Sequence, residues 1–208
     1  MKTRILCQTQ QLFMQYGIRS VSMDDIAGSL GISKKTIYQY YKDKNSLAKD
    51  FVSHVVSNSC DNAECVGSGA ANAIEEVLLE TDSVDELFNY MNPVVIYDLQ
   101  KYFPEAYGIF ANYRDEYIYN SIKSNIERGI AEGLYREDLN VEVATRFRVE
   151  SFMLLFSPEN YNRLNISMLE IHRELCYFFL YSLVSSKGYK LLTKYQKDRQ
   201  KPTLNGKN

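Results

Sequence analysis

Residues 21–47, VSMDDIAGSLGISKKTIYQYYKDKNSL, constrain the fold of this chain more than any other stretch of its sequence. Ser22 and Asp25 have the spacing of a capping box, in which a hydroxyl and a carboxylate accept hydrogen bonds from backbone N–H groups at a helix start. An apolar face follows at helical spacing and consists of Ile26, Ala27 and Leu30. Gly31 comes directly after it, where a helix end favours a residue that tolerates positive φ. The pattern therefore predicts a short helix that ends at Gly31.

A second helix is predicted over residues 34–41. Ser33 can cap it, and Ile37 and Tyr41 can face inward because they stand four residues apart. The outward positions are Lys34, Lys35, Thr36, Tyr38, Gln39 and Tyr40. Two short helices joined by a glycine turn, the second with a basic and hydroxyl-rich outer face, predict a helix-turn-helix with its recognition helix.

Residues 13–47, FMQYGIRSVSMDDIAGSLGISKKTIYQYYKDKNSL, resemble the N-terminal domain of TetR-family transcriptional regulators. The matching positions are Phe13, Gly17, Ser22, Ile26, Ala27, Leu30, Gly31, Ile32, Ser33, Thr36, Ile37, Tyr38, Tyr40, Tyr41, Lys44 and Leu47. Lys35 departs from the family, where many members have a small residue or proline, and so does Asn45, which is often acidic. The resemblance implies an all-α protein with an N-terminal three-helix helix-turn-helix domain and a C-terminal helical domain that binds a ligand and dimerises.

We expect three regions along the chain. Residues 1–46 form the DNA-binding domain, residues 47–188 form the effector-binding and dimerisation domain, and residues 189–208 form a basic, frayed tail. Two glycines and a serine within residues 65–71 are expected to interrupt the helical pattern. The predicted helices outside the motif cover residues 2–16, 44–60, 71–80, 84–90, 94–102, 105–132, 141–156 (before Pro158) and 167–185.

Charge is distributed unevenly along the chain, although the whole protein carries a net charge of only −2. Residues 1–50 contain eight Lys or Arg and four Asp or Glu, whereas residues 51–186 contain nine and 21. Residues 187–208 are basic again, with seven and one. A basic N-terminal region on an acidic body is typical of a DNA-binding domain joined to a domain that does not touch DNA.

Candidate DNA-binding side chains lie at the helix starts and on the outer face of the recognition helix. They are Arg4, Ser22, Lys34, Lys35, Thr36, Tyr38, Gln39, Tyr40 and Lys44. Lysines can contact phosphates or guanine, and Gln39 can read adenine. Lys44 stands at a helix N-terminus, which favours a phosphate. The resemblance assigns Tyr38 to a phosphate, and which residues read bases stays open. The expected partner is double-stranded DNA with a palindromic operator.

Aromatic side chains crowd the middle of the chain, which has 17 Tyr, 10 Phe and no Trp. A pocket between helices, lined by rings and a few phenols, would suit an apolar or aromatic effector. The candidate effector-binding residues are Met91, Tyr97, Phe110, Tyr113, Tyr117 and Phe152. Ordinary core packing is the alternative for each of these rings, and neither the identity nor the charge of the small-molecule effector follows from the sequence.

The last two long helices are apolar around more than one face, which predicts that each is covered on more than one side. The resemblance implies a homodimer through a four-helix bundle made by these helices, and such a dimer would hold two DNA-binding domains at a fixed spacing. The candidate interface residues are Phe152, Phe156, Leu175, Phe179 and Leu183.

Several classes of function lack a signal in the sequence. No phosphate-binding loop, GxSxG, HExxH or CxxC motif is present, so we expect neither an enzyme nor a cofactor or metal. Cys7, Cys60, Cys65 and Cys176 are expected to act as small buried hydrophobes, and neither His54 nor His172 has a patterned Ser or Cys partner. No apolar run is long enough to span a membrane and no signal peptide is evident, so a cytoplasmic protein is expected.

Together these features predict a sequence-specific transcriptional regulator. The leading hypothesis is a repressor that a small-molecule effector releases from a palindromic operator. The alternative is a DNA-bound scaffold or an activator whose C-terminal domain binds a protein partner.

Overall fold

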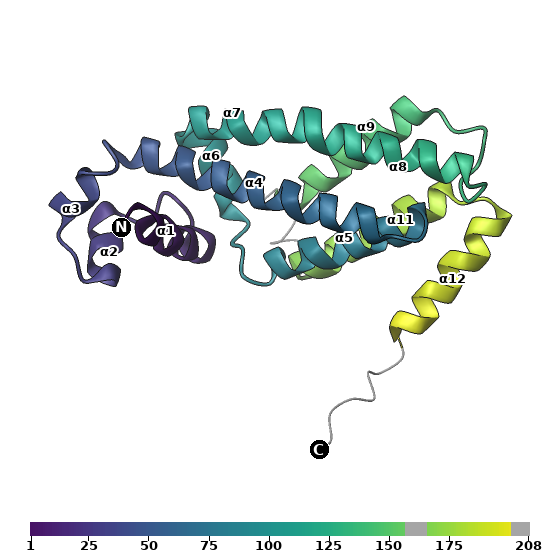
Figure 1. The fold of residues 1–208 in the computed structure, drawn as a ribbon, viewed down its shortest axis with the longest axis horizontal. Coiled ribbons are helices and arrows are strands. Elements are labelled where there is room, and N and C mark those ends of the chain that lie inside the picture. Colours follow the sequence, from purple (N-terminus) through teal and green to yellow (C-terminus); the bar gives the residue numbers. More distant parts are fainter. Residues whose placement is uncertain (157–165, 201–208) are drawn as a thin grey trace, which may run out of the picture.

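The computed structural model describes residues 1–156 and 166–200, and helices dominate this part of the chain (Figure 1). No β-strand occurs within these residues, apart from an isolated antiparallel bridge between Tyr135 and Val184. The fold is therefore all-α, as the sequence predicts. We refer to residues 1–46 as the head and to the remaining described residues as the body. In Figure 1 the head lies at one end of an elongated molecule and α12 lies at the other.

Local hydrogen bonds shape the head as the sequence predicts. Its helices are α1 (Lys2–Tyr16), α2 (Met23–Leu30) and α3 (Lys34–Tyr38). The Oγ of Ser22 accepts from the backbone N–H of Asp25 at 3.1 Å, and the Asp25 carboxylate accepts from the Ser22 N–H at 2.7 Å. Gly31 ends α2 with a left-handed φ of 65°. The recognition helix α3 ends three residues earlier than expected.

The helix that leaves the head is longer than the sequence suggests. Asp43 and Ser46 form a capping box at the start of α4 (Lys44–Gly69), which continues through the glycines that were expected to break it. A glycine inside a helix costs about 1 kcal/mol, and packing of α4 against α5 and α7 offsets this cost. The next helix, α5 (Ala73–Phe88), is one continuous element capped by Asn72, so the expected break near residue 82 is wrong.

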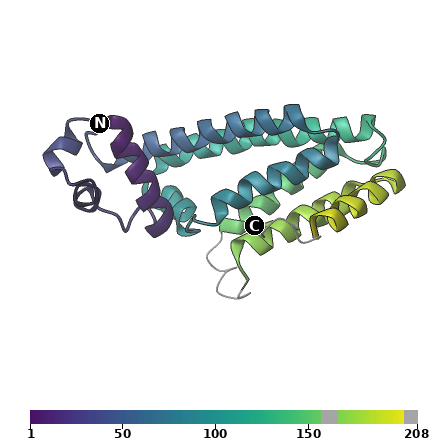
Figure 2. The ribbon, with the colours of Figure 1, turned by 60° about the horizontal axis from the view of Figure 1, so that its bottom comes forward.

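The middle of the body consists of α6 (Val94–Tyr102) and a long helical run. The run comprises α7 (Pro104–Asn112), a π-helical segment η1 (Tyr113–Ile118) and α8 (Tyr119–Ala131). Figure 2 shows this run beside α4, which it contacts through α7. The sequence predicts a single helix here and does not reveal the π-helical turn. Such turns are uncommon and often occur at functional sites.

The C-terminal part of the described chain contains the largest error of the sequence interpretation. After α9 (Val141–Met153), η2 (Leu154–Phe156) and α11 (Met168–Leu183), residues expected to form a frayed tail form α12 (Ser186–Gln200). Leu192 of α12 is fully buried, and Arg199 pairs with Asp82 at 2.8 Å. Burial of an apolar stripe on α12 explains why it is ordered. Pro158 and residues 201–208 lie outside the described residues.

Two clusters of buried apolar side chains stabilise the molecule. The first joins the head to α4, α6, the start of α7 and η2, and the second lies at the far end among α5, α8, α11 and α12. The head and the near half of the body therefore share one core. None of the helices in residues 1–156 and 166–200 combines the length and apolar character that a membrane crossing requires. The same residues contain no cluster of three or more His, Cys, Asp or Glu side chains suited to a metal ion.

Candidate nucleic-acid interface and ligand cavity

The recognition helix separates an inward face from an outward face. Ile37 is fully buried and Tyr41 is 3% exposed, whereas Tyr38 and Tyr40 are 46% and 43% exposed. Ser33 caps the helix by accepting from the Thr36 N–H at 3.1 Å. Exposure of two aromatic rings to water is unfavourable, so this face is suited to a partner that covers them.

The remaining candidates of the recognition helix also lie on its outer side. Lys35 and Gln39 are exposed, and Thr36 is half-buried with its hydroxyl within 2.9 Å of Ser33 Oγ. Lys34 is exposed and forms an ion pair with Asp24 at 2.7 Å, which raises the pKa of its ammonium group. A solvated pair of this kind is weak, so Lys34 can exchange Asp24 for another anion.

The three candidates outside α3 differ in their exposure and in the hydrogen bonds that they already make within the protein. Ser22 is exposed at the start of α2 and is already engaged in the capping box. The guanidinium of Arg4 donates to the Leu30 carbonyl at 3.4 Å. Lys44 is half-buried and donates to the Arg19 carbonyl at 3.1 Å, and burial lowers the pKa of its ammonium group. Lys44 therefore belongs to the joint between head and body as well as to the start of α4.

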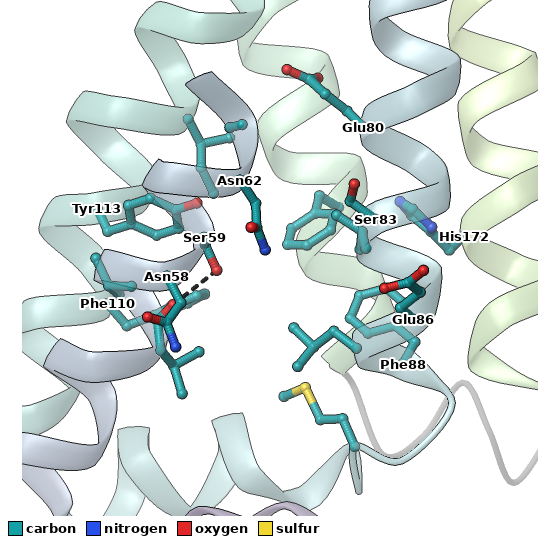
Figure 3. A pocket seen from close by; sticks show the side chains of 18 of the residues that line it. Asn58, Ser59, Asn62, Glu80, Ser83, Glu86, Phe88, Phe110, Tyr113 and His172 are labelled. Carbon is teal, nitrogen blue, oxygen red and sulfur yellow. Dashed lines mark hydrogen bonds between the residues drawn. The ribbon is translucent and has the colours of Figure 1, made fainter. Parts of the chain in front are cut away.

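A cavity of about 390 Å³ lies in the body, between α4, α5, α6, the α7–η1 run and α9 (Figure 3). Its lining includes five of the six predicted effector residues, namely Met91, Phe110, Tyr113, Tyr117 and Phe152. The rings of Tyr113 and Tyr117 stack at 5.4 Å on the π-helical segment. Burial raises the pKa of the Tyr113 phenol above its ordinary value, so this phenol stays protonated.

Tyr97 does not belong to the cavity, and its prediction as an effector residue is wrong. It is 37% exposed, and its hydroxyl accepts from Lys101 at 2.8 Å on the outer side of α6. The neighbouring Val95 and Ile96 line the cavity instead. Successive residues on a helix point about 100° apart, and the tyrosine-rich composition does not reveal which of them turn inward.

The sequence interpretation missed the polar groups of the cavity. Glu80 lines it, and burial followed by the charge of Glu76 raises the pKa of the Glu80 carboxyl to about 7. Arg148 also lines it and is only 9% exposed, and its Nη1 has no hydrogen-bond partner among the described residues. Figure 3 shows Glu80 at one end of the cavity, and Asn58, Ser59 and Asn62 on the side opposite Phe88. A charged residue inside an apolar helical segment was the available signal for both Glu80 and Arg148.

Three of the five predicted dimer residues are buried inside one subunit. Phe156, Phe179 and Leu183 are 7%, 2% and 1% exposed, Phe152 lies in the cavity wall, and Leu175 packs against the first core cluster. The assignment of Phe156, Phe179 and Leu183 to an interface is therefore wrong, whereas that of the partly exposed Phe152 and Leu175 stays a prediction. Exposed apolar residues instead occupy the outer sides of the neighbouring helices α9 and α11 and of the η2 turn, at Val143, Phe147, Leu154, Phe178 and Tyr181. We call these five residues the outer apolar face.

Helix α6 joins the cavity to the head. Asp98, which is 4% exposed, accepts from the Arg19 N–H at 2.7 Å, and the Arg19 guanidinium lies 4.6 Å from the Tyr102 ring. Gly17 has a φ of 84°, and a Cβ there would stand 2.6 Å from Val94. The Met14 carbonyl accepts from the Asn92 N–H. The segment after α1 is thus held against α6, and an adjacent face of α6 lines the cavity.

Comparison with known proteins agrees with this architecture. Residues 5–51 match the family model for bacterial regulatory proteins of the tetR family. The chain is 30% identical over 108 residues to the uncharacterized HTH-type transcriptional regulator YvaF of Bacillus subtilis, covering 51% of this chain but only 56% of that protein. It is 25% identical over 155 residues to the HTH-type transcriptional repressor KstR2 of Rhodococcus jostii, covering 70% of this chain and 73% of that protein.

The fold is also similar to that of solved regulators. A transcriptional regulator from Saccharomonospora viridis, crystallised with choline, superimposes with a TM-score of 0.72 at 19% identity, covering 88% of this chain and 97% of that one. The relatives are transcriptional regulators, in line with the expectation that this chain is not an enzyme. The helix-turn-helix head, the all-helical body and these matches together show that the chain belongs to the TetR family of transcriptional regulators.

Proposed function

We propose that this protein is a dimeric repressor that binds a palindromic operator through α2 and α3, and that a small molecule in the body cavity releases it. The observation that carries the proposal is the position of α6. One face of this helix holds the head through Asp98, and the adjacent face lines the cavity through Val95 and Leu99.

The outer face of α3 supports DNA binding. Tyr38, Tyr40, Lys35 and Gln39 are exposed on one short helix that a fully buried Ile37 fixes to the head. Hydroxyl and ammonium groups on such a face can donate to phosphates and base edges in a major groove. The excess of basic over acidic residues in the first 50 positions supports the same partner.

The cavity supports a small-molecule effector. Its volume of about 390 Å³ lies within the range of ordinary ligand sites, and its wall is mainly apolar with a few polar groups. The choline in complex with the Saccharomonospora viridis regulator, which has a similar fold, supports a small-molecule ligand for this chain. A ligand that favours a shifted α6 would move the Arg19 contact and hence the head, which is a two-state coupling.

The outer apolar face supports dimerisation. Phe147 and Phe178 are 58% and 63% exposed on helices that contact each other, and two copies of such a face can cover one another. A dimer would hold two α3 helices at a fixed distance and so select a palindrome with a fixed half-site spacing.

The operator is tested by selecting bound DNA from a random pool with the purified protein. We expect an enriched palindrome, and its absence with folded, unliganded protein would contradict the proposal.

Lys35→Ala should then reduce the slope of log affinity against log salt by about one if Lys35 contacts a phosphate. Lys194→Ala is the matched control, because Lys194 is exposed on α12 at the end of the molecule remote from the head.

The effector site is tested with a small-molecule library screened by thermal shift. A molecule that raises the melting temperature should also release the selected operator. Tyr113→Ala should abolish both effects, whereas Tyr97→Ala should leave both intact because Tyr97 lies outside the cavity. Equal loss in the two variants would place the ligand elsewhere.

The dimer is tested by light scattering on Phe147→Asp and Phe178→Asp. Each variant should be monomeric, because the substitution places a charge in the proposed interface. Each should also be folded, because both rings are exposed in one subunit. Tyr16→Asp is the control, since Tyr16 is 52% exposed on α1 and away from this face. A dimer that survives both substitutions would overturn the assignment of the outer apolar face.

A further inference from the structure

Cys176 lies at the centre of a buried polar cluster where α5, α9 and α11 meet. Its side chain is 1% exposed, and three polar groups converge on the sulfur. The Thr81 hydroxyl lies 3.1 Å from Sγ, His172 Nε2 lies 3.7 Å from it, and Arg148 Nη2 donates to it. A buried thiol that serves only for packing does not need a guanidinium and an imidazole as neighbours.

His172 is held in a fixed orientation by a carboxylate. Its Nδ1 lies 2.9 Å from Asp85, and the two side chains are 2% and 4% exposed. Asp85 also accepts a hydrogen bond from Arg173 Nε at 2.6 Å. With Nδ1–H donating to Asp85, Nε2 faces Sγ and can take the thiol proton. A thiol, an imidazole and an orienting carboxylate in sequence are the parts of an activated nucleophile.

Arg148 adds a positive charge that needs an anion. Its charge acts on the Glu80 carboxyl, but it forms no hydrogen bond to a carboxylate among the described residues, and a buried guanidinium without a hydrogen-bonded anion is costly. Burial alone would raise the pKa of the Cys176 thiol, but the charge of Arg148 and the hydrogen bond with His172 outweigh burial and lower it to about 7. The thiolate is therefore an anion that this cluster can supply at neutral pH.

The cluster borders the cavity. Thr81, Arg148 and His172 line it but Cys176 does not, so the sulfur lies directly behind these side chains and an electrophile reaches it when one of them moves aside. The second guanidinium nitrogen, Nη1 of Arg148, is buried and has no partner within the described residues. A carbonyl oxygen entering the cavity could accept from Nη1 while Nη2 stays on the sulfur. One guanidinium would then hold both a nucleophile and the oxygen of an electrophile.

We propose that Cys176 is a covalent modification site for α,β-unsaturated carbonyl compounds that enter the cavity. In the reaction the thiolate sulfur forms a bond to the β carbon, and the carbon–carbon π pair moves to give an enolate. Arg148 Nη1 stabilises the enolate oxygen. The proton that left the thiol for His172 then returns to the α carbon, so the product is a neutral thioether and no oxidant or reductant is needed. The proposal does not depend on DNA binding.

The test is timed labelling of the full chain at pH 7 with N-ethylmaleimide, a small α,β-unsaturated imide, followed by peptide mass spectrometry. We expect folded protein to be modified at Cys176 at least as fast as at Cys7, which is exposed on α1. Modification of Cys176 only in denaturant, while Cys7 reacts in the folded protein, would overturn the proposal.

Matched arginine variants on α9 separate the guanidinium from general effects. Arg148→Met should slow labelling of Cys176 by at least about tenfold, because the fraction of thiolate at pH 7 falls as the pKa of the thiol rises. Arg146→Met should not change the rate, since Arg146 is exposed and lies over Tyr119. An unchanged rate in folded Arg148→Met would contradict the role of the guanidinium.

A second measurement avoids altering Arg148, whose loss could unfold the body. Thiolates absorb near 240 nm, so the folded protein at pH 8 should absorb more than folded Cys176→Ser by the amount of about one thiolate. No difference between the two folded proteins would overturn the proposal.

Discussion

The head and the body differ in how closely their side chains are packed. In the head, Phe13, Ile26 and Ile37 are fully buried, and short-range caps fix the helix starts. The body instead encloses a cavity and buries charged groups such as Asp85 and Arg148. The difference indicates that close packing keeps the head in one conformation, whereas the body is less closely packed because it contains a cavity and reactive polar groups. Binding sites commonly carry such a cost in stability.

The largest expected contrast comes from the same truncation in the two regions. Phe13→Ala should destabilise the protein by about 3–5 kcal/mol, because Phe13 is fully buried and packs edge-to-face with Phe51 at 5.4 Å. Phe110→Ala should cost less than about 2 kcal/mol, since one side of this ring already faces the cavity and fewer contacts are lost. Urea unfolding measures the free energy of unfolding of both variants, and equal losses would contradict the difference in packing between head and body.

The corrected C-terminal helix gives the next effect. Leu192→Ala should cost about 2–4 kcal/mol because Leu192 is fully buried in the second core cluster. Lys194→Ala, on an exposed position of the same helix, should leave the free energy of unfolding unchanged within about 0.5 kcal/mol. An unchanged free energy of unfolding in Leu192→Ala would instead support the original prediction that this segment is a frayed tail.

Carboxyl groups should give opposite pH dependences in the two regions. The pKa of Glu80 is raised to about 7 in the folded body from an ordinary 4.5, so its contribution to stability is present below pH 4.5 and is lost as the pH rises through 7. Glu80→Gln should therefore stabilise the protein at pH 8 by about 2 kcal/mol and have little effect at pH 4.

Asp25 in the head provides the contrast to Glu80. The Ser22 hydrogen bonds lower the pKa of its carboxyl, so its contribution is present at neutral pH and is lost as the pH falls below the ordinary value of 3.8. Asp25→Asn should destabilise the protein at pH 7. Melting curves from pH 3 to pH 8 measure both variants, and parallel profiles for Glu80→Gln and the wild type would contradict the Glu80 assignment.

The smallest expected effect concerns a cap in the head. Ser22→Ala should cost about 1 kcal/mol, because it removes the acceptor of the Asp25 N–H at the start of α2. Ser57→Ala, at an exposed position within α4, is the control and should be neutral or slightly stabilising. Differential scanning calorimetry resolves a difference of this size as a shift in melting temperature.

Much of the head could be predicted because its determinants are close in sequence. The Ser22 and Ser33 caps each join residues three positions apart, and the glycine turn depends on one backbone conformation. The sequence also indicated most of the rings around the cavity, because aromatic side chains are concentrated in that part of the chain. It did not indicate that Tyr97 points outward, since the inward side of α6 is set by the helices that pack on it.

The sequence by itself determined the helical class, the capped helix-turn-helix and the outward residues of α3, because each depends on hydrogen bonds and periodicity within one or two turns. The tertiary structure alone decided the rest. Arg19 and Asp98 are 79 residues apart, and His172 and Asp85 are 87 apart, so no local pattern relates them. The order of α12, the burial of Phe179 and the contact of Arg148 with Cys176 likewise arise only when distant helices meet, because burial and charge pairing are properties of the assembled core.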